Sequence, residues 1–191
     1  MDHLEGNISA YGLFVISRNA AQVVKVFEKI KSGDPQMRQY LQLSQMPHEC
    51  AIAFRRFLRS WKIQFLPLRC INVLGGNITN VPPRLVALDV LNLLPEEYSG
   101  TRLYFAKRYL RLMRCFILRG CPRPNEMHAV TIPILAYMFS FPQRHHHTLA
   151  TSLTIFELII LSELLNDTVA LAKELRSSCI AFRRSSSDGT G

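Results

Sequence analysis

Arginine is the residue type in this sequence that is best placed to do chemistry. Arg55, Arg56 and Arg59 fall close together at helical spacing, and a second basic stretch holds Arg102, Lys107, Arg108, Arg111 and Arg114. A guanidinium is permanently charged and presents planar donors that match anionic groups. The pattern predicts docking to an acidic partner, although a solvated helix face would carry the same charges.

The other reactive residue types favour no catalytic or metal site. The cysteines are odd in number and form no C-x-x-C pair, which indicates free thiols in a reducing compartment; they are Cys50, Cys70, Cys115, Cys121 and Cys179. His145-His146-His147 lacks a second cluster of ligands, so we expect no metal. Because P-loop, H-E-x-x-H and G-x-S-x-G motifs are also missing, we expect no cofactor and no enzyme activity of the chain's own.

Composition predicts a folded chain with acidic partners. The 191 residues are 48% hydrophobic, 19% charged and carry a net charge of +9. Such a chain can bury a sizeable core, and it attracts acidic protein surfaces, anionic lipid or nucleic acid. We expect no nucleic acid partner, because the basic stretch from Arg102 to Arg114 does not interleave aromatic stacking residues in the manner of single-strand binders.

Two segments bear on localisation. The first nine residues are polar and lack the apolar core of a signal peptide, which favours the cytoplasm, with association at an anionic membrane surface as an alternative. Thr148–Leu165 is apolar enough to raise the question of a membrane span. Its Glu157 and Glu163 favour a buried core helix, because a charge in mid-span is costly in lipid.

Hydrophobic residues recur at helical spacing almost throughout, which predicts an all-α multi-helix bundle. Asn19 is expected to cap a helix that Ser32-Gly33-Asp34-Pro35 ends. Pro67–Pro83 is expected to be a loop. The other predicted helices span 48–63, 84–94 with a stop at Pro95, 96–118, 125–139 and 147–166, with a further turn or two over 168–175. In the helix over 48–63, the three arginines are expected opposite the buried side.

Four segments, in order, resemble motifs of the RhoGAP domain, the module that accelerates GTP hydrolysis by Rho-family GTPases. Gly12–Ala20 reads G-L-F-V-I-S-R-N-A and is similar to the family's catalytic loop, roughly G-[IL]-F-R-[VI]-S-G-N-A. His48–Arg59 resembles the helix H-x-V-A-x-L-L-K-x-[FY]-L-R, Leu91–Tyr98 the L-P-x-x-N element, and Asn125–Met127 the N-K-M element. The resemblance covers about Tyr11–Leu165 and implies a RhoGAP-like bundle that is shortened at its N-terminus.

Two departures from the family bear on the chemistry. The family's catalytic arginine finger falls on Val15, and its later asparagine falls on Thr131 or Ile134. A finger contributes about 10³ to 10⁵ in rate, and valine supplies neither charge nor hydrogen bond. Arg18 is the nearest substitute, but three residues of extended chain displace it by about 10 Å.

The resemblance implies a set of GTPase-facing residues. The family's basic helix residues, which face the GTPase and support the finger loop, fall on Arg55 and Arg59; Arg18 and Thr131 complete the set. The expected function is a RhoGAP-like regulator that binds a Rho-family small GTPase and stimulates hydrolysis weakly or not at all. Two alternatives stay open: an active GTPase activator that uses Arg18 or a finger-free mechanism, and a helical protein- or membrane-docking module without GTPase binding.

The expected domain plan has three parts: a short lead over 1–10, the RhoGAP-like helical domain over 11–176, and a disordered tail over 177–191. The tail is rich in serine, which favours disorder at a terminus. Within it, Arg183-Arg184-Ser185-Ser186 resembles a phosphorylation site for a basic-directed kinase.

Overall fold

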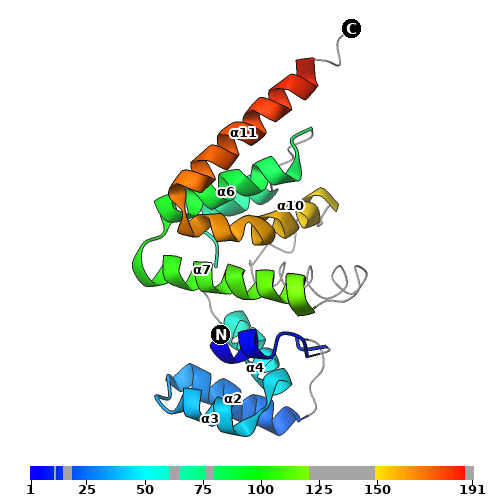
Figure 1. Ribbon diagram of the computed structural model, residues 1–191. Helices are drawn as coiled ribbons and strands as arrows, with labels where there is room; N and C mark the ends of the chain where they lie inside the picture. The colour runs from blue at the N-terminus through cyan, green and yellow to red at the C-terminus, as the bar shows by residue number, and fades with distance from the viewer. Residues whose placement is uncertain (11, 15–18, 61–64, 76–79, 121–148, 188–191) are drawn as a thin grey trace. The chain divides into compact units, whose positions relative to one another are not determined.

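The computed structural model describes residues 1–10, 12–14, 19–60, 65–75, 80–120 and 149–187 (Figure 1). In this part of the chain the regular elements are all helical, so the all-α prediction is confirmed there. The α-helices are α1 (Asp2–Gly6), α2 (Ala20–Ser32), α3 (Met37–Ser44), α4 (Pro47–Ser60), α5 (Leu68–Gly75), α6 (Pro83–Glu97), α7 (Gly100–Cys115), α10 (Leu149–Ile160) and α11 (Thr168–Ser187). A π-helical turn, η1 (Phe116–Gly120), follows α7, and a 3-10 helix, η3 (Leu161–Asn166), follows α10.

Contacts group the chain into two compact units, where the sequence predicts a single domain over 11–176. The first unit comprises Met1–Phe65 and Leu112–Phe141, and the second comprises Leu66–Arg111 and Pro142–Gly191. The predicted lead over 1–10 belongs to the first unit, because it forms α1, which packs against α3 and α4 and buries Leu4.

The first unit is built on the packing of α2 against α4. As predicted, α2 begins after Asn19, whose side chain accepts a hydrogen bond from the Gln22 backbone N–H at 3.1 Å. It ends at Gly33, where φ is +66°, a conformation that suits glycine because it has no Cβ. The buried face of α2 holds Val23, Val26 and Phe27, and α4 turns Cys50, Ala51, Ala53 and Phe54 inward.

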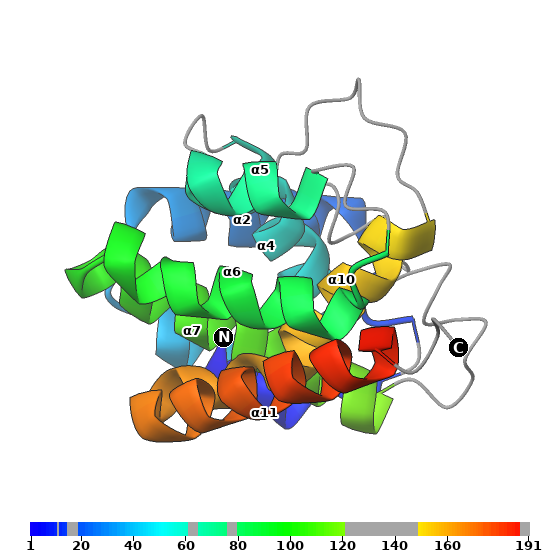
Figure 2. The same cartoon turned by 90° about the horizontal axis from the view of Figure 1, so that it is seen from above.

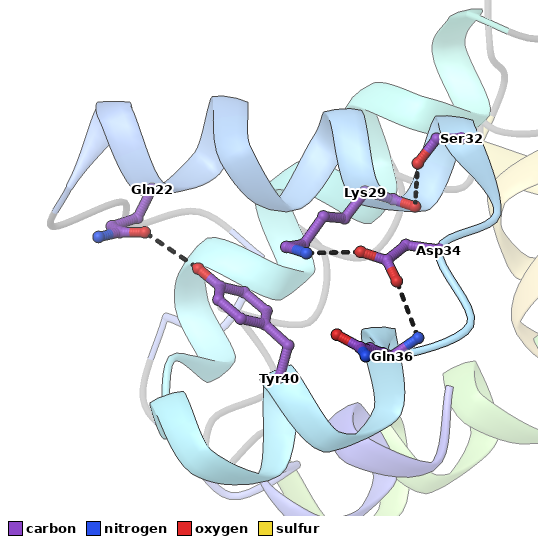
Figure 3. A network of polar contacts seen from close by, with 6 residues as sticks. All are labelled: Gln22, Lys29, Ser32, Asp34, Gln36 and Tyr40. Atoms are coloured by element: carbon purple, nitrogen blue, oxygen red, sulfur yellow. Dashed lines mark hydrogen bonds and ion pairs between the residues drawn. The ribbon is translucent and has the colours of Figure 1, made fainter.

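A polar network closes the turn between α2 and α3 (Figure 3). The Lys29 ammonium lies 2.5 Å from an Asp34 carboxylate oxygen, and the second oxygen accepts from the Gln36 backbone N–H at 2.8 Å. The Tyr40 hydroxyl donates to the Gln22 side-chain oxygen at 3.2 Å, and the Lys29 ammonium lies 5.0 Å from the centre of the Tyr40 ring. Because these contacts join the two helices on either side of the turn, they hold α3 against α2.

The second unit is built around α6, which packs against α5, α10 and α11 (Figure 2). Its buried residues include Val86, Leu88, Leu91 and Leu94, which explains why it contacts several helices at once. At its start, an Arg84 guanidinium nitrogen lies 3.5 Å from a carboxylate oxygen of Glu157 in α10, and a second pairs with Glu174 in α11. Arg84 therefore links three helices.

Two predictions about α5 and α6 are wrong. Pro67–Pro83 is not simply a loop, since α5 lies within it and buries Cys70, Ile71 and Leu74 on one face. Helix α6 does not stop at Pro95 but continues to Glu97, and the Tyr98 N–H still donates to the Leu94 carbonyl at 2.9 Å. Proline is tolerated near the end of a helix because only one ladder bond is lost there.

The boundaries after α6 also differ from prediction. The next helix starts at Gly100, and not at 96, because Tyr98 is extended and Gly100 has a φ of +54°. The expected disorder over 177–191 is wrong as far as Ser187, since α11 is a continuous helix of 20 residues.

The apolar stretch predicted over 148–165 is described from Leu149 on, where it forms α10 and η3. Ile155, Leu158 and Ile159 are fully buried, which confirms the prediction of a core helix. Among the residues that the structure describes, none of the helices is both long enough and apolar enough to cross a bilayer. The helix predicted over 125–139 lies outside the described residues.

Candidate functional site

The segment that leads into α2 is attached to α4 at two main-chain atoms. A guanidinium nitrogen of Arg55 donates a hydrogen bond of 3.0 Å to the carbonyl oxygen of Phe14. A carboxylate oxygen of Glu49 accepts one of 3.1 Å from the backbone N–H of Asn19. Both side chains belong to α4, so a single helix is hydrogen-bonded to the segment at Phe14 and again at Asn19. Residues 15–18, between these two contacts, lie outside the described part of the chain. We call these two contacts the α4 clamp.

The residues just before this gap are part of the core. Leu13 is 0% exposed and Phe14 is 1% exposed. The Phe14 ring meets the Phe116 ring of η1 edge-on, with the centroids 5.1 Å apart, an arrangement that aromatic pairs favour. Gly12 has a φ of +68°, which a residue with a Cβ adopts only at a cost. The chain therefore enters the candidate site from a rigid, buried position.

Asn19 has two roles on the far side of the gap. Its side chain caps α2, and its own N–H is one half of the α4 clamp. The Glu49 carboxylate that accepts this N–H is only 5% exposed, so the hydrogen bond lies in a setting where an unpaired polar group would be costly. Asn19 thus joins the start of α2 to α4.

The structure places the three predicted arginines of α4 in different environments. Arg55 is half-buried, and its side chain turns toward Phe14, so the expectation that it lies on the side away from the fold is wrong. Arg56 is exposed, with its guanidinium carbon 5.0 Å from the centre of the Phe27 ring of α2. Arg59 is exposed near the C-terminal end of α4. Arg55 therefore supports the loop, while Arg56 and Arg59 present charge to solvent.

Several predicted site residues lie outside the described residues. They are Val15 at the finger position, its possible substitute Arg18, and Thr131 and Ile134 at the asparagine position. The N-K-M-like element Asn125–Met127 and the histidines 145–147 lie there as well. Within the described ranges, no three side chains of the His, Cys, Asp or Glu type gather as they would around a metal ion.

Hydrogen bonding and burial explain the shifted pKa values of Asp34, Cys50 and Cys70. The hydrogen bond from Lys29, aided by the Gln36 N–H, lowers the pKa of Asp34. Burial raises the pKa of the Cys50 thiol to about 11 and that of the Cys70 thiol to about 12. Thiols of this kind are almost entirely protonated at neutral pH and are poor nucleophiles.

Sequence patterns alone could not reveal Glu49 as part of the site. It stands beside His48, at a position that is variable in the RhoGAP motif which this stretch resembles, and its partner Asn19 is 30 residues away. The one available signal is an acidic residue in the first turn of an apolar helix, which is ordinarily explained by the helix dipole.

Comparison of the chain with family models, with curated proteins and with solved structures gives no match. In the described part of the chain the regular elements are helical, and one helix, α4, is hydrogen-bonded to two main-chain atoms of the segment that precedes α2.

Proposed function

We propose that this protein is a RhoGAP-like module that binds a Rho-type small GTPase without stimulating its GTP hydrolysis. The observation that carries the proposal is the α4 clamp on the Gly12–Ala20 segment. In the RhoGAP resemblance, a basic residue of the motif helix supports the finger loop, and Arg55 both occupies that position and donates to the Phe14 carbonyl.

The lack of stimulation follows from the side chain at the finger position. A GAP arginine places a fixed cation against the charge that develops on the transferring phosphoryl group. Val15 can supply neither that charge nor a hydrogen bond. The missing arginine would have lowered the barrier to hydrolysis by about 4 to 7 kcal/mol. Without it, the GTPase should hydrolyse GTP at almost its intrinsic rate.

Binding rests on different residues. The exposed residues Arg56 and Arg59 lie on the same helix as the clamp, and the chain carries a net charge of +9. Opposite charge on a GTPase surface would accelerate encounter and fix orientation. Complex formation should therefore weaken as the salt concentration rises, because exposed charges are screened.

The test of the chemistry is single-turnover GTP hydrolysis by a panel of Rho-family GTPases. The native chain is compared with Val15→Arg, and Val15→Ala serves as the matched control that alters the side chain without adding charge. The proposal expects no stimulation by the native chain or by Val15→Ala, and a clear acceleration by Val15→Arg.

Stimulation by the native chain would overturn the proposal. If Arg18→Ala then abolished that stimulation, Arg18 would be the working finger.

The test of docking is binding of GTPases loaded with a non-hydrolysable GTP analogue. Arg59→Glu should weaken binding at least tenfold, the effect of about 1.4 kcal/mol. Arg176→Glu, on an exposed position of α11, makes the same charge change in the second unit and should leave binding nearly unchanged. If the native chain bound none of the GTPases, the proposal would be wrong, and the alternative of a helical docking module without GTPase binding would remain.

A further inference from the structure

The C-terminal end of α11 carries a sequence pattern that the proposed function does not use. The chain contains two Arg-Arg pairs, Arg55-Arg56 and Arg183-Arg184, and only the second is followed two residues later by a serine, Ser186. The side chains of Arg183, Arg184 and Ser186 are all exposed. Because residues two apart do not share a face of a helix, an enzyme can reach the two charges and the hydroxyl together once this end of α11 is extended.

The hydroxyls of the last turn are bonded locally. Ser185 Oγ donates to the Phe182 carbonyl at 2.8 Å, and Ser186 Oγ donates to the same carbonyl at 3.0 Å. Both are the local bonds that serine side chains make to the carbonyl three or four residues before them in a helix.

The end of α11 is also remote from the contacts that fix the helix in the second unit. The ion pair between Arg84 and Glu174 lies in the first half of α11. Figure 1 shows the C-terminal part of α11, drawn in red, diverging from α6 and α10. Helix ends fray, and a diverging end can open into the extended form that a kinase cleft requires without disturbing the packed part of the unit.

We propose that Ser186 is a phosphorylation site for a basic-directed serine kinase that uses MgATP. Carboxylates of such a kinase would pair with the guanidiniums of Arg183 and Arg184, three and two residues before the serine. Ser186 Oγ attacks the γ-phosphorus of ATP and forms an O–P bond. The bond from the γ-phosphorus to the β,γ-bridging oxygen breaks, ADP leaves, and the hydroxyl proton passes to the base of the kinase.

The modification has a structural consequence. It removes the hydroxyl that donates to the Phe182 carbonyl and places negative charge at the end of the helix where the dipole is already negative. The added negative charge disfavours the helical form of the final turn. Phosphorylation at Ser186 therefore unwinds the C-terminal turn of α11, while the part near Arg84 stays folded.

The experiment treats the purified full chain with MgATP and the catalytic subunit of cAMP-dependent protein kinase, a basic-directed enzyme. Intact mass gives the number of phosphates, and peptide fragmentation gives their position. The variants are Ser186→Ala, Ser185→Ala as the matched neighbouring control, and Arg183→Ala. Circular dichroism of each variant establishes that the helices are retained.

The expected result is one phosphate at Ser186 in the native chain and in Ser185→Ala, and none in Ser186→Ala. Arg183→Ala should lower kcat/KM at least tenfold, as the loss of one charge-assisted contact predicts. Amide exchange over 183–187 should accelerate after phosphorylation and stay unchanged near Glu174. Failure of the native chain to be modified, or incorporation at Ser185 with Ser186 untouched, would overturn the assignment.

Discussion

Arg55 and Phe14, 41 residues apart in the sequence, are joined by a hydrogen bond of 3.0 Å from the guanidinium to the main-chain carbonyl. The Phe14 side chain is 1% exposed, and its ring packs edge-on against the Phe116 ring. The same residue is therefore held from two directions, by packing on its ring and by a charge-assisted bond on its backbone. At Phe14, the segment before α2 is therefore part of the folded first unit.

The first prediction concerns that hydrogen bond. Arg55→Met keeps much of the aliphatic stem but removes the donor, and it should lower the free energy of unfolding by about 1 kcal/mol. Amide exchange at residues 12–14 should accelerate in the native state. Arg56→Met, the adjacent control, removes a contact with the Phe27 ring and should cost a comparable amount without altering exchange at 12–14. Equal exchange in the two variants would show that the Arg55 bond does not hold the segment.

The second prediction concerns the other half of the α4 clamp. Glu49→Gln retains an acceptor for the Asn19 N–H, whereas Glu49→Leu removes it from a position that is 5% exposed. Glu49→Leu should lower the free energy of unfolding by about 1 to 3 kcal/mol relative to the native chain, and Glu49→Gln should lower it by a smaller amount. Urea titration of the three proteins gives the comparison, and a leucine variant as stable as the glutamine variant would contradict the assigned role.

The third prediction measures the ring pair of Phe14 and Phe116. Phe14→Ala should destabilise the chain by about 3 to 5 kcal/mol, because it empties a fully buried site. A double-mutant cycle with Phe14→Leu and Phe116→Leu should give a coupling energy of about 0.5 to 1.5 kcal/mol beyond simple burial. Additive effects in that cycle would mean that the two rings pack independently.

The fourth prediction is a pH dependence carried by Asp34. Its pKa lies below the ordinary value of 3.8, chiefly because Lys29 bonds to the carboxylate. The stabilisation is therefore fully present above about pH 4 and is lost as the pH falls from there through the folded-state pKa. Asp34→Asn should flatten the pH dependence of the urea midpoint below pH 4 relative to the native chain. A native Asp34 that titrates at or above 3.8 by NMR would contradict the lowered pKa.

The fifth prediction concerns thiol reactivity. Burial raises the pKa of Cys50 to about 11 and that of Cys70 to about 12, so at pH 8 their thiolate fractions are about 10⁻³ and 10⁻⁴. Cys115 and Cys179 are partly exposed. Iodoacetamide at pH 8, followed by peptide mass analysis, should label Cys115 and Cys179 well before Cys50 and Cys70. In urea all four should react at similar rates, and early labelling of Cys70 in the native chain would argue against its burial in α5.

Local signals predicted the helix starts and stops that depend on a single residue. Asn19 caps α2 and Gly33 ends it, because a side-chain acceptor and a left-handed φ are properties of the residue type itself. Helix-breaking residues account for the wrong loop prediction over Pro67–Pro83. Pro67 and Gly75 lie at the ends of α5, and the residues between them, Cys70, Ile71 and Leu74, have the spacing of a short helix with one buried face.

The serine-rich end of α11 shows a different limit. Low hydrophobicity favours disorder, but in α11 the hydroxyls of Ser177, Ser185 and Ser186 donate hydrogen bonds to carbonyls of the same helix. Cys179 and Phe182 are in addition partly buried. The α4 clamp was unpredictable for a further reason. Its partners are 41 and 30 residues apart, and only packing of α2 on α4 brings them together.

Both contacts of the α4 clamp grip main-chain atoms, the carbonyl oxygen of Phe14 and the N–H of Asn19. Every amino acid other than proline offers the same two groups, so the attachment is indifferent to the side chains that stand between the two grips. The positions from 15 to 18 can therefore accumulate substitutions without weakening the hold of α4 on the segment. Under the proposed function, Val15→Arg would therefore add a finger to a segment whose two main-chain attachments to α4 stay as they are.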